Sequence, residues 1–179
     1  MIRVRDDDVF IRPSFGKFKE THETILDFPN AIHVAGIICD SPWEPEVLEY
    51  IRHETVRKKI EIQLHGWQHI DYAKLTKDEM RGHMKMSFEW LHDHFWVKPT
   101  IWYTPWGAHT PVMDEVAAEF NLALVDCSNI LQTNKMLEAL RSKHRGAYIK
   151  GFREHGEVLI HYWESKTRKP LREVLEAIA

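Results

Sequence analysis

The sequence predicts an α/β fold in which mostly parallel strands are covered by outer helices. Short apolar, β-branched runs alternate along the chain with amphipathic segments. No internal repeat, low-complexity tract or Gly/Ser linker divides the 179 residues, of which 44% are hydrophobic and 28% charged. We therefore expect one domain over residues 1–179, whose parallel strands end at a common edge where ligands bind in such folds.

Seven segments have the character of strands. The first, Ile2 to Arg5, opens the chain, and the second, Ala31 to Cys39, is almost continuously apolar. Ile60 to Leu64 alternates strictly between apolar and polar residues, which is typical of a half-buried strand. The other candidates are Thr100 to Thr104, Leu122 to Asp126, Ala147 to Phe152 and Val158 to His161.

Helices are expected between these strands. The clearest begins at Thr76, where Thr76 and Glu79 have the spacing of a capping box and apolar residues follow every three or four positions to Phe95. Thr110 before Pro111 predicts a second helix start, with a stripe that ends at Asn121. Further helices are expected near Glu20 to Asp27, Glu46 to Arg57, Met136 to Lys143 and Leu171 to Ile178.

The charge and cysteine content narrow the class of protein. The net charge is −3 without a long Lys/Arg run, which argues against nucleic acid as a partner. No segment approaches the roughly 18 apolar residues of a membrane span, and the first residues are charged where a signal peptide would be apolar. With only Cys39 and Cys127, a disulfide scaffold is not expected. We expect a soluble, cytoplasmic protein, whose oligomeric state the sequence does not determine.

Three carboxylates, Asp6, Asp7 and Asp8, follow the first strand. Adjacent negative charges repel one another, so they are best tolerated around a bound cation or in water. A solvated turn with a helix-capping aspartate is the structural alternative.

Two histidines, His65 and His69, follow the third strand. Histidines four residues apart can bind one metal ion, and Gly66 favours a strand end followed by a turn. Chance pairs are common in a chain with 12 His, and His92 and His94, two apart on a helix, are interpreted as surface residues.

Aromatic residues and a further histidine lie at the other strand ends. Trp102 to Gly107 contains a Pro–Trp–Gly turn, and tryptophan rings either stack on sugars or fill a core. His161 ends the last strand and could donate a proton, with Asp126 orienting it, although a structural role is the common alternative. Four of the seven tryptophans fall in these segments and predict an aromatic-walled cleft: Trp67, Trp102, Trp106 and Trp163.

The order of these motifs resembles the polysaccharide deacetylase (NodB-homology) family, a group of carbohydrate esterases similar to carbohydrate esterase family 4. The resemblance extends from the Asp pair through His-x-x-x-His and Pro-Trp-Gly to Leu-x-His at position 161. It implies a distorted (β/α) barrel of about seven strands and a metal-dependent deacetylase acting on N-acetylated sugars.

The resemblance also implies roles for individual residues. Asp7 would be the general base and Asp8 a metal ligand, although a shift to Asp6 and Asp7 stays open. His65 and His69 would complete the site of a divalent metal, zinc in the first place, with cobalt, nickel or manganese as alternatives. The backbone at Pro105–Trp106 would help to hold the oxyanion, and His161 would protonate the departing amine.

Three positions depart from the family pattern. Val9 stands in place of a glycine, and Gly66 in place of a serine or threonine. Tyr103 stands where the family has an arginine that pairs with the catalytic aspartate, so Arg5 or Arg3 would have to supply that charge.

These observations favour hydrolysis of an N-acetyl group on a carbohydrate substrate, with an intracellular glycan precursor as the preferred class. A carbohydrate-binding protein on a degenerate deacetylase fold is the first alternative. A metal-dependent hydrolase of another ester or amide bond, such as a phosphoester, is the second, with Arg3, Arg5, Arg12 and Lys98 as the nearest cations.

Overall fold

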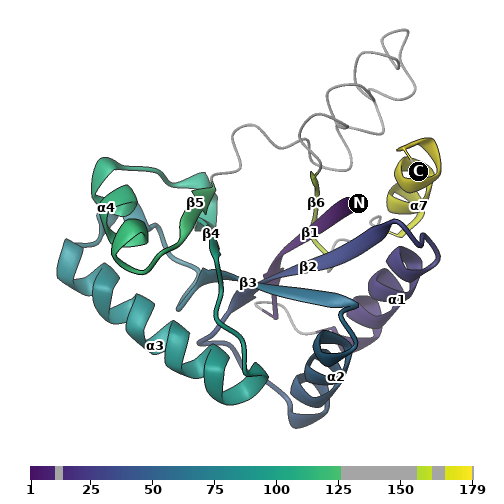
Figure 1. Cartoon of the computed structure of the whole chain (residues 1–179), viewed down its shortest axis with the longest axis horizontal. Helices are drawn as coiled ribbons and strands as arrows, with labels where there is room; N and C mark the ends of the chain where they lie inside the picture. The colour runs from purple at the N-terminus through teal and green to yellow at the C-terminus, as the bar shows by residue number, and fades with distance from the viewer. Residues whose placement is uncertain (11–13, 126–156, 163–167, 179) are drawn as a thin grey trace, which may run out of the picture.

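The structure is a computed structural model that describes residues 1–10, 14–125, 157–162 and 168–178. In this part of the chain, six parallel strands form one curled, half-barrel sheet in the order β5-β4-β3-β2-β1-β6 (Figure 1). The strands are β1 Ile2–Val9, β2 Ala31–Ile38, β3 Ile60–Gly66, β4 Ile101–Tyr103, β5 Ala123–Val125 and β6 Glu157–Ile160.

Five α-helices accompany the sheet in the same described ranges. They are α1 Phe15–Leu26, α2 Pro45–Val56, α3 Lys77–Phe95, α4 Pro111–Glu119 and α7 Arg168–Ile178. Two short 3-10 helices, Tyr72–Lys74 and Pro105–Gly107, follow β3 and β4. None of the helices described is long and apolar enough to cross a membrane.

The α/β fold with parallel strands is confirmed, and in the described residues the sheet is a curled half-barrel. Six strands are present where about seven were expected, and β5 and β6 form the two edges of an open sheet within the described residues. The remaining candidate strand, Ala147 to Phe152, and the helix expected at Met136 to Lys143 lie outside the described residues.

The helix starts follow the capping signals. The Thr76 hydroxyl accepts the Glu79 N–H at 3.3 Å, and the Glu79 carboxylate accepts the Thr76 N–H at 2.8 Å, which completes the expected capping box of α3. Helix α1 begins at Phe15, five residues before its expected start at Glu20. Its buried face carries the polar His22, which interrupts the apolar pattern that would have revealed the helix.

The two faces of the sheet differ in chemistry. Helices α1, α2 and α3 contact β2 and β3 on one face, where the larger apolar cluster includes Phe18, Ile37 and Leu64. Helix α7 contacts α1, and its Leu171 belongs to a second cluster that also contains Val4 of β1. Because strand side chains alternate, the residues between these apolar positions point to the opposite face.

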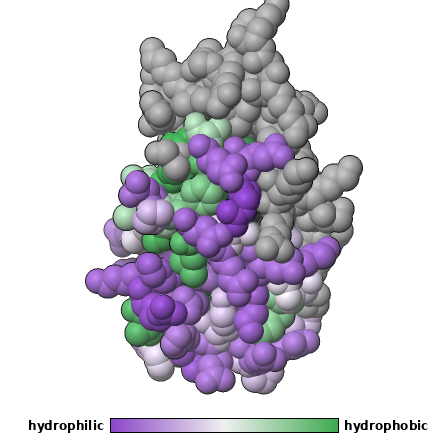
Figure 2. All heavy atoms as spheres, turned by 90° about the vertical axis from the view of Figure 1, so that its right-hand side faces the viewer, coloured by the Kyte–Doolittle hydropathy of each residue, from purple (hydrophilic) through white to green (hydrophobic). Residues whose placement is uncertain are grey.

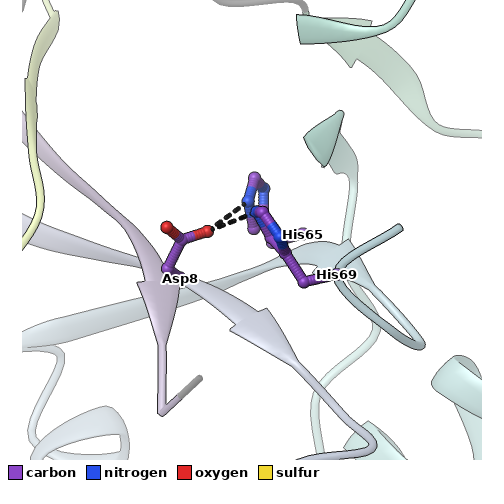
Figure 3. Close-up of side chains that lie close together, drawn as sticks. All are labelled: Asp8, His65 and His69. Carbon is purple, nitrogen blue, oxygen red and sulfur yellow. Dashed lines mark hydrogen bonds and ion pairs between the residues drawn. The ribbon is translucent and has the colours of Figure 1, made fainter. Parts of the chain in front are cut away.

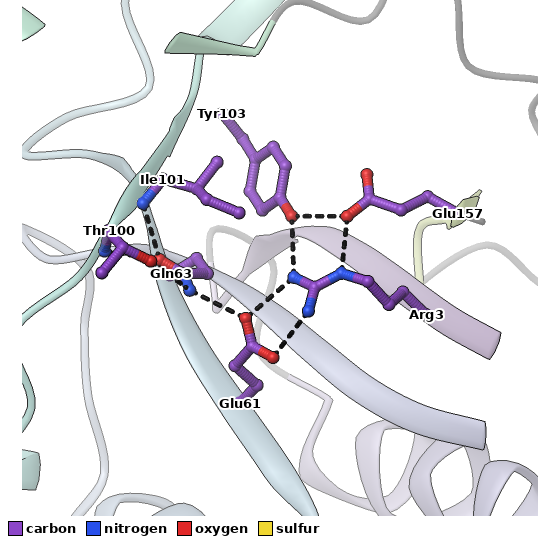
Figure 4. Close-up of polar contacts among 7 residues, drawn as sticks. All are labelled: Arg3, Glu61, Gln63, Thr100, Ile101, Tyr103 and Glu157. Atoms are coloured by element: carbon purple, nitrogen blue, oxygen red, sulfur yellow. Dashed lines mark hydrogen bonds and ion pairs between the residues drawn. The ribbon is translucent and has the colours of Figure 1, made fainter. Parts of the chain in front are cut away.

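That opposite face carries a network of charged side chains that connects four strands (Figure 4). Arg3 of β1 pairs with Glu61 of β3 at 2.7 and 2.8 Å and with Glu157 of β6 at 2.9 Å. The Tyr103 hydroxyl of β4 donates to Glu157 at 2.9 Å. Gln63 of β3 accepts two backbone N–H groups at the start of β4. The face that lacks these helices is therefore cross-linked by ion pairs and hydrogen bonds.

Figure 2 shows the molecule from the right-hand side of Figure 1. Hydrophilic and hydrophobic residues are interspersed over the described part of this surface. The most exposed large aromatic side chains among the described residues are Trp96, at 66%, and Trp106, at 73%.

Candidate metal centre

The three aspartates at the end of β1 point in three directions. Asp7 shares the charged face with Arg5 because the two are two residues apart on a strand, and Asp6 points to the helix-covered face. Beyond Asp6 the pairing of β1 with β2 shifts in register, and Asp8 adopts a left-handed conformation with φ of 58°. This irregularity turns the Asp8 carboxylate toward the end of β3.

Asp8, His65 and His69 converge on one point (Figure 3). One carboxylate oxygen of Asp8, Oδ1, lies 2.9 Å from His65 Nε2 and 2.8 Å from His69 Nε2. The three ligand atoms lie within 4.8 Å of one another. All three side chains are largely withdrawn from solvent, and His69 is the most exposed at 13%.

The hydrogen bonds around these residues fit a cation. His65 Nδ1 lies 2.9 Å from the Tyr103 carbonyl oxygen, which can only accept, so Nδ1 carries a proton and Nε2 is the nitrogen left to bind a cation. Without a cation, Nε2–H donates to Asp8 at 2.9 Å, and a bound cation would take the place of that proton. Burial acts to raise the pKa of Asp8, but hydrogen bonds from His65 and His69 outweigh it and hold this pKa well below its ordinary value. An ionised carboxylate with two imidazoles is a donor set that suits zinc and related divalent metals.

The turn between the two histidines is shaped by Gly66 and Tyr72. Gly66 has φ of 151°, and a Cβ there would lie 2.9 Å from the Gln68 carbonyl oxygen and 3.0 Å from the Tyr72 hydroxyl. The Tyr72 hydroxyl in turn accepts the Trp67 N–H at 2.8 Å. This crowding explains why glycine, rather than serine or threonine, follows His65.

Asp7 is held by Arg5. Arg5 Nε and Nη2 donate to the two oxygens of Asp7 at 2.7 and 2.6 Å, and both side chains are buried. The Arg5 guanidinium lies 3.8 Å from the ring centroid of Tyr103. Of the two arginines considered for this pairing, the structure selects Arg5, while Arg3 is engaged with Glu61 and Glu157.

His161 lies directly after β6 and faces the same site. Its Nε2 is 3.7 Å from Asp8 Oδ2, and its side chain is 20% exposed. Asp126, the residue proposed to orient it, and Trp163 lie outside the described residues.

The tryptophans divide between the core and the surface. Trp106 is exposed, has a left-handed φ of 60°, and places its ring 4.7 Å from the His69 ring, centroid to centroid. Its neighbour Pro105 is buried. Trp67 is half-buried against the apolar cluster. Trp102 is corrected from a cleft wall to a core residue, because it is fully buried and packs edge-on against Tyr72.

Sequence reasoning missed a buried polar chain behind Asp6. His33 Nε2 lies 3.2 Å from Asp6, His33 Nδ1 lies 3.1 Å from His22 Nδ1, and His22 Nε2 lies 3.5 Å from Glu54. Burial lowers the pKa of His33 to about 3, and burial together with His33 lowers that of His22 to about 4. The only sequence signal was a histidine within the apolar second strand.

The fold and this arrangement of carboxylate and histidines define an α/β domain with a candidate metal centre at the ends of its parallel strands. The chain belongs to the polysaccharide deacetylase family, whose model matches residues 26–125. The match includes the histidine pair and the Pro-Trp-Gly turn but neither the aspartates nor His161.

Several solved structures share the fold at low sequence identity. A family 4 carbohydrate esterase from Streptomyces lividans, in complex with acetate, is 13% identical with a TM-score of 0.71, covering 99% of this chain and 86% of that one. Peptidoglycan deacetylase PdaC from Bacillus subtilis is 13% identical with a TM-score of 0.67, covering 98% and 80%.

A third similar structure is described as a pseudoenzyme. Wild-type BA3943 from Bacillus anthracis, a CE4 family pseudoenzyme, is 15% identical with a TM-score of 0.70, covering 99% of this chain and 60% of that one. A comparison with curated proteins gave no match.

Proposed function

We propose that the protein is a metal-dependent hydrolase that removes the acetyl group from an N-acetylated sugar or glycan precursor. The observation that carries this proposal is the convergence of Asp8, His65 and His69 beside an arginine-bound Asp7. It is supported by membership of the polysaccharide deacetylase family.

Asp8, His65 and His69 would hold the divalent cation, with zinc as the first candidate. Such an ion supplies Lewis-acid activation of the acetyl carbonyl and of the attacking water. His65 is kept in the required tautomer by its bond to the Tyr103 carbonyl.

The reaction adds water to the acetyl carbonyl and breaks the C–N bond, giving acetate and a free amine. Asp7 accepts the proton of the attacking water, since Arg5 fixes both carboxylate oxygens and each keeps a further lone pair. His161 gives a proton to the departing nitrogen. The exposed ring of Trp106 offers a flat face on which a sugar can stack.

The test measures acetate release from N-acetylglucosamine and its oligomers after loading with zinc, cobalt, nickel or manganese. His161→Ala and Asp7→Asn are expected to lose activity, and His92→Ala, a histidine that is 74% exposed on α3, serves as the matched control. Failure of the wild type to bind metal, or full activity of His161→Ala, would refute the proposal.

A sugar-binding protein without catalysis is the second candidate. It is favoured by the similar fold of BA3943, which is described as a pseudoenzyme. Under this alternative, the chain would bind N-acetylated sugars and release no acetate, and binding would depend on Trp106 but survive Asp7→Asn.

A phosphoester substrate receives less support. Arg3 and Arg5, which could clamp a phosphate, are both bound to carboxylates. A panel of phosphoesters beside the N-acetyl sugars separates the two reactions. The cytoplasmic location stays a prediction from the sequence.

A further inference from the structure

The end of β6 lies where β1 changes direction. The paired register of β1 and β6 runs from Arg3 opposite Glu157 to Asp6 opposite Ile160. Asp7, the next residue of β1, begins the irregular stretch that points the Asp8 side chain toward the metal centre. On the other strand, the residue after Ile160 is His161. His161 therefore leaves the sheet at the point where the regular pairing of its strand with β1 stops.

The Asp6 side chain continues the connection between the two strands. Asp6 Oδ1 accepts the backbone N–H of Tyr162, the residue after His161, at 2.9 Å. Asp6 is fully buried, and Tyr162 is buried with its ring against Phe10 and Phe18. A carboxylate oxygen of β1 thus holds the backbone one residue beyond His161.

Asp6 is itself held from behind. Its other oxygen, Oδ2, lies 3.2 Å from Nε2 of the fully buried His33, and His33 contacts His22 of α1 at 3.1 Å. His22 Nε2 in turn lies 3.5 Å from the carboxylate of Glu54 on α2, and Glu54 also pairs with Arg57 at 3.0 Å. Because each group is fixed by the next, the Asp6 carboxylate has little freedom to rotate.

We propose that Asp6 is a positioning residue for His161, anchoring the end of β6 to β1 so that the imidazole faces Asp8. This inference rests on the proposed function, in which His161 protonates the departing amine. The competing explanation is that the buried chain from Asp6 to Glu54 serves stability alone.

The variants separate these explanations. Asp6→Ala removes the acceptor for Tyr162, whereas Asp6→Asn keeps an oxygen that can accept the same N–H. Asp6→Leu combined with His33→Leu replaces both buried partners by apolar groups, and keeps the test available if Asp6→Ala does not fold. Gln63→Ala is the matched control, since Gln63 is also buried and accepts backbone N–H groups of a neighbouring strand, at Thr100 and Ile101.

The activity readout compares two leaving groups with the zinc-loaded protein. An N-acetyl sugar releases an amine that needs a proton, while 4-nitrophenyl acetate releases a phenolate that does not. Asp6→Ala and the double leucine variant are expected to lower kcat on the sugar about tenfold. Removal of the general acid in His161→Ala should lower it by roughly 100-fold or more. KM, zinc affinity and ester hydrolysis should change little, and Asp6→Asn should recover most of the rate.

A double-mutant cycle provides the second readout. If Asp6 acts through His161, adding Asp6→Ala to His161→Ala should cause no further loss. Equal losses on both substrates, or losses that add to those of His161→Ala, would overturn the proposal, as would a Gln63→Ala variant with the same selective loss.

The third readout does not depend on activity. In metal-free protein, NMR signals of the His161 ring should shift or broaden in Asp6→Ala and stay in place in Gln63→Ala. If the wild type releases no acetate, the proposed function has failed, and these signals alone decide whether Asp6 positions His161. Unchanged His161 signals in Asp6→Ala would refute the positioning role.

Discussion

Replacing Arg5 with alanine should strongly destabilise the protein. The change removes two hydrogen bonds from a guanidinium to the Asp7 carboxylate, at 2.7 and 2.6 Å, and leaves Asp7 2% exposed without its partner. Hydrogen bonds to charged groups contribute about 1.5–3 kcal/mol each, so two account for about 3–6 kcal/mol. Removal of one partner from a buried ion pair costs about 3–5 kcal/mol, which agrees with this range.

The assay is urea unfolding of the metal-free protein at pH 7, followed by circular dichroism. Arg81→Ala is the matched control because Arg81 makes the same two-point pair with Glu119, at 2.7 Å for each bond, in an exposed position. Its loss should be about 0–1 kcal/mol. An Arg5→Ala variant that loses less than about 1 kcal/mol, or no more than the control, would refute the reasoning.

Arg5→Ala should also lower kcat, because Asp7 loses the group that orients it. Adding Tyr103→Arg should return part of the activity, since the Tyr103 ring lies 3.8 Å from the Arg5 guanidinium and an arginine side chain would start beside the vacated space. No recovery in this double variant would show that the position of the charge along the chain matters.

Three further predictions concern the metal, the substrate and pH. Zinc should raise the melting temperature of the metal-free wild type and not that of His69→Ala. Gly66→Ala should weaken zinc binding measured by calorimetry, because a Cβ at this φ would be strained and would crowd Gln68 and Tyr72. Trp106→Ala should raise KM for N-acetylated sugars more than it lowers kcat, since the ring is exposed beside His69. Because burial lowers the pKa of His22 to about 4, the unfolded state takes up its proton first as the pH falls below about 6.5. The stability advantage of wild type over His22→Phe in urea unfolding should therefore shrink between pH 6.5 and 4, and a constant difference would contradict this.

Much of the fold and part of the site could be predicted from the sequence. The apolar runs predicted β2 and β3 nearly at their observed bounds. The shared direction of parallel strands placed Asp8, at the end of β1, near His65 and His69, at the end of β3. The strands could be predicted because an apolar pattern is a local property of the sequence. The neighbouring strand ends could be predicted because all strands of a parallel sheet run in the same direction.

Other features depend on geometry that a pattern does not contain. The contact between His22 and His33 requires α1 to lie over β2 at one particular rotation. The bulge that turns the Asp8 side chain depends on a backbone conformation with φ of 58°. The residue type at that position did not predict this conformation. The alternation of side chains along β4 does predict that Trp102 and Tyr103 face opposite sides of the sheet. Trp102 is buried in the core, and Tyr103 lies on the charged face against Arg5.

The run of three aspartates has a consequence for how this chain tolerates change. Each carboxylate has its own cationic or imidazole partner, His33 for Asp6, Arg5 for Asp7, and the histidine pair for Asp8. Deleting one of them would leave two carboxylates for three sets of partners, so at least one of the ion pair, the anchor and the metal centre would be lost. Three chemically identical neighbours are thus not spare copies of one another, because each position meets different partners.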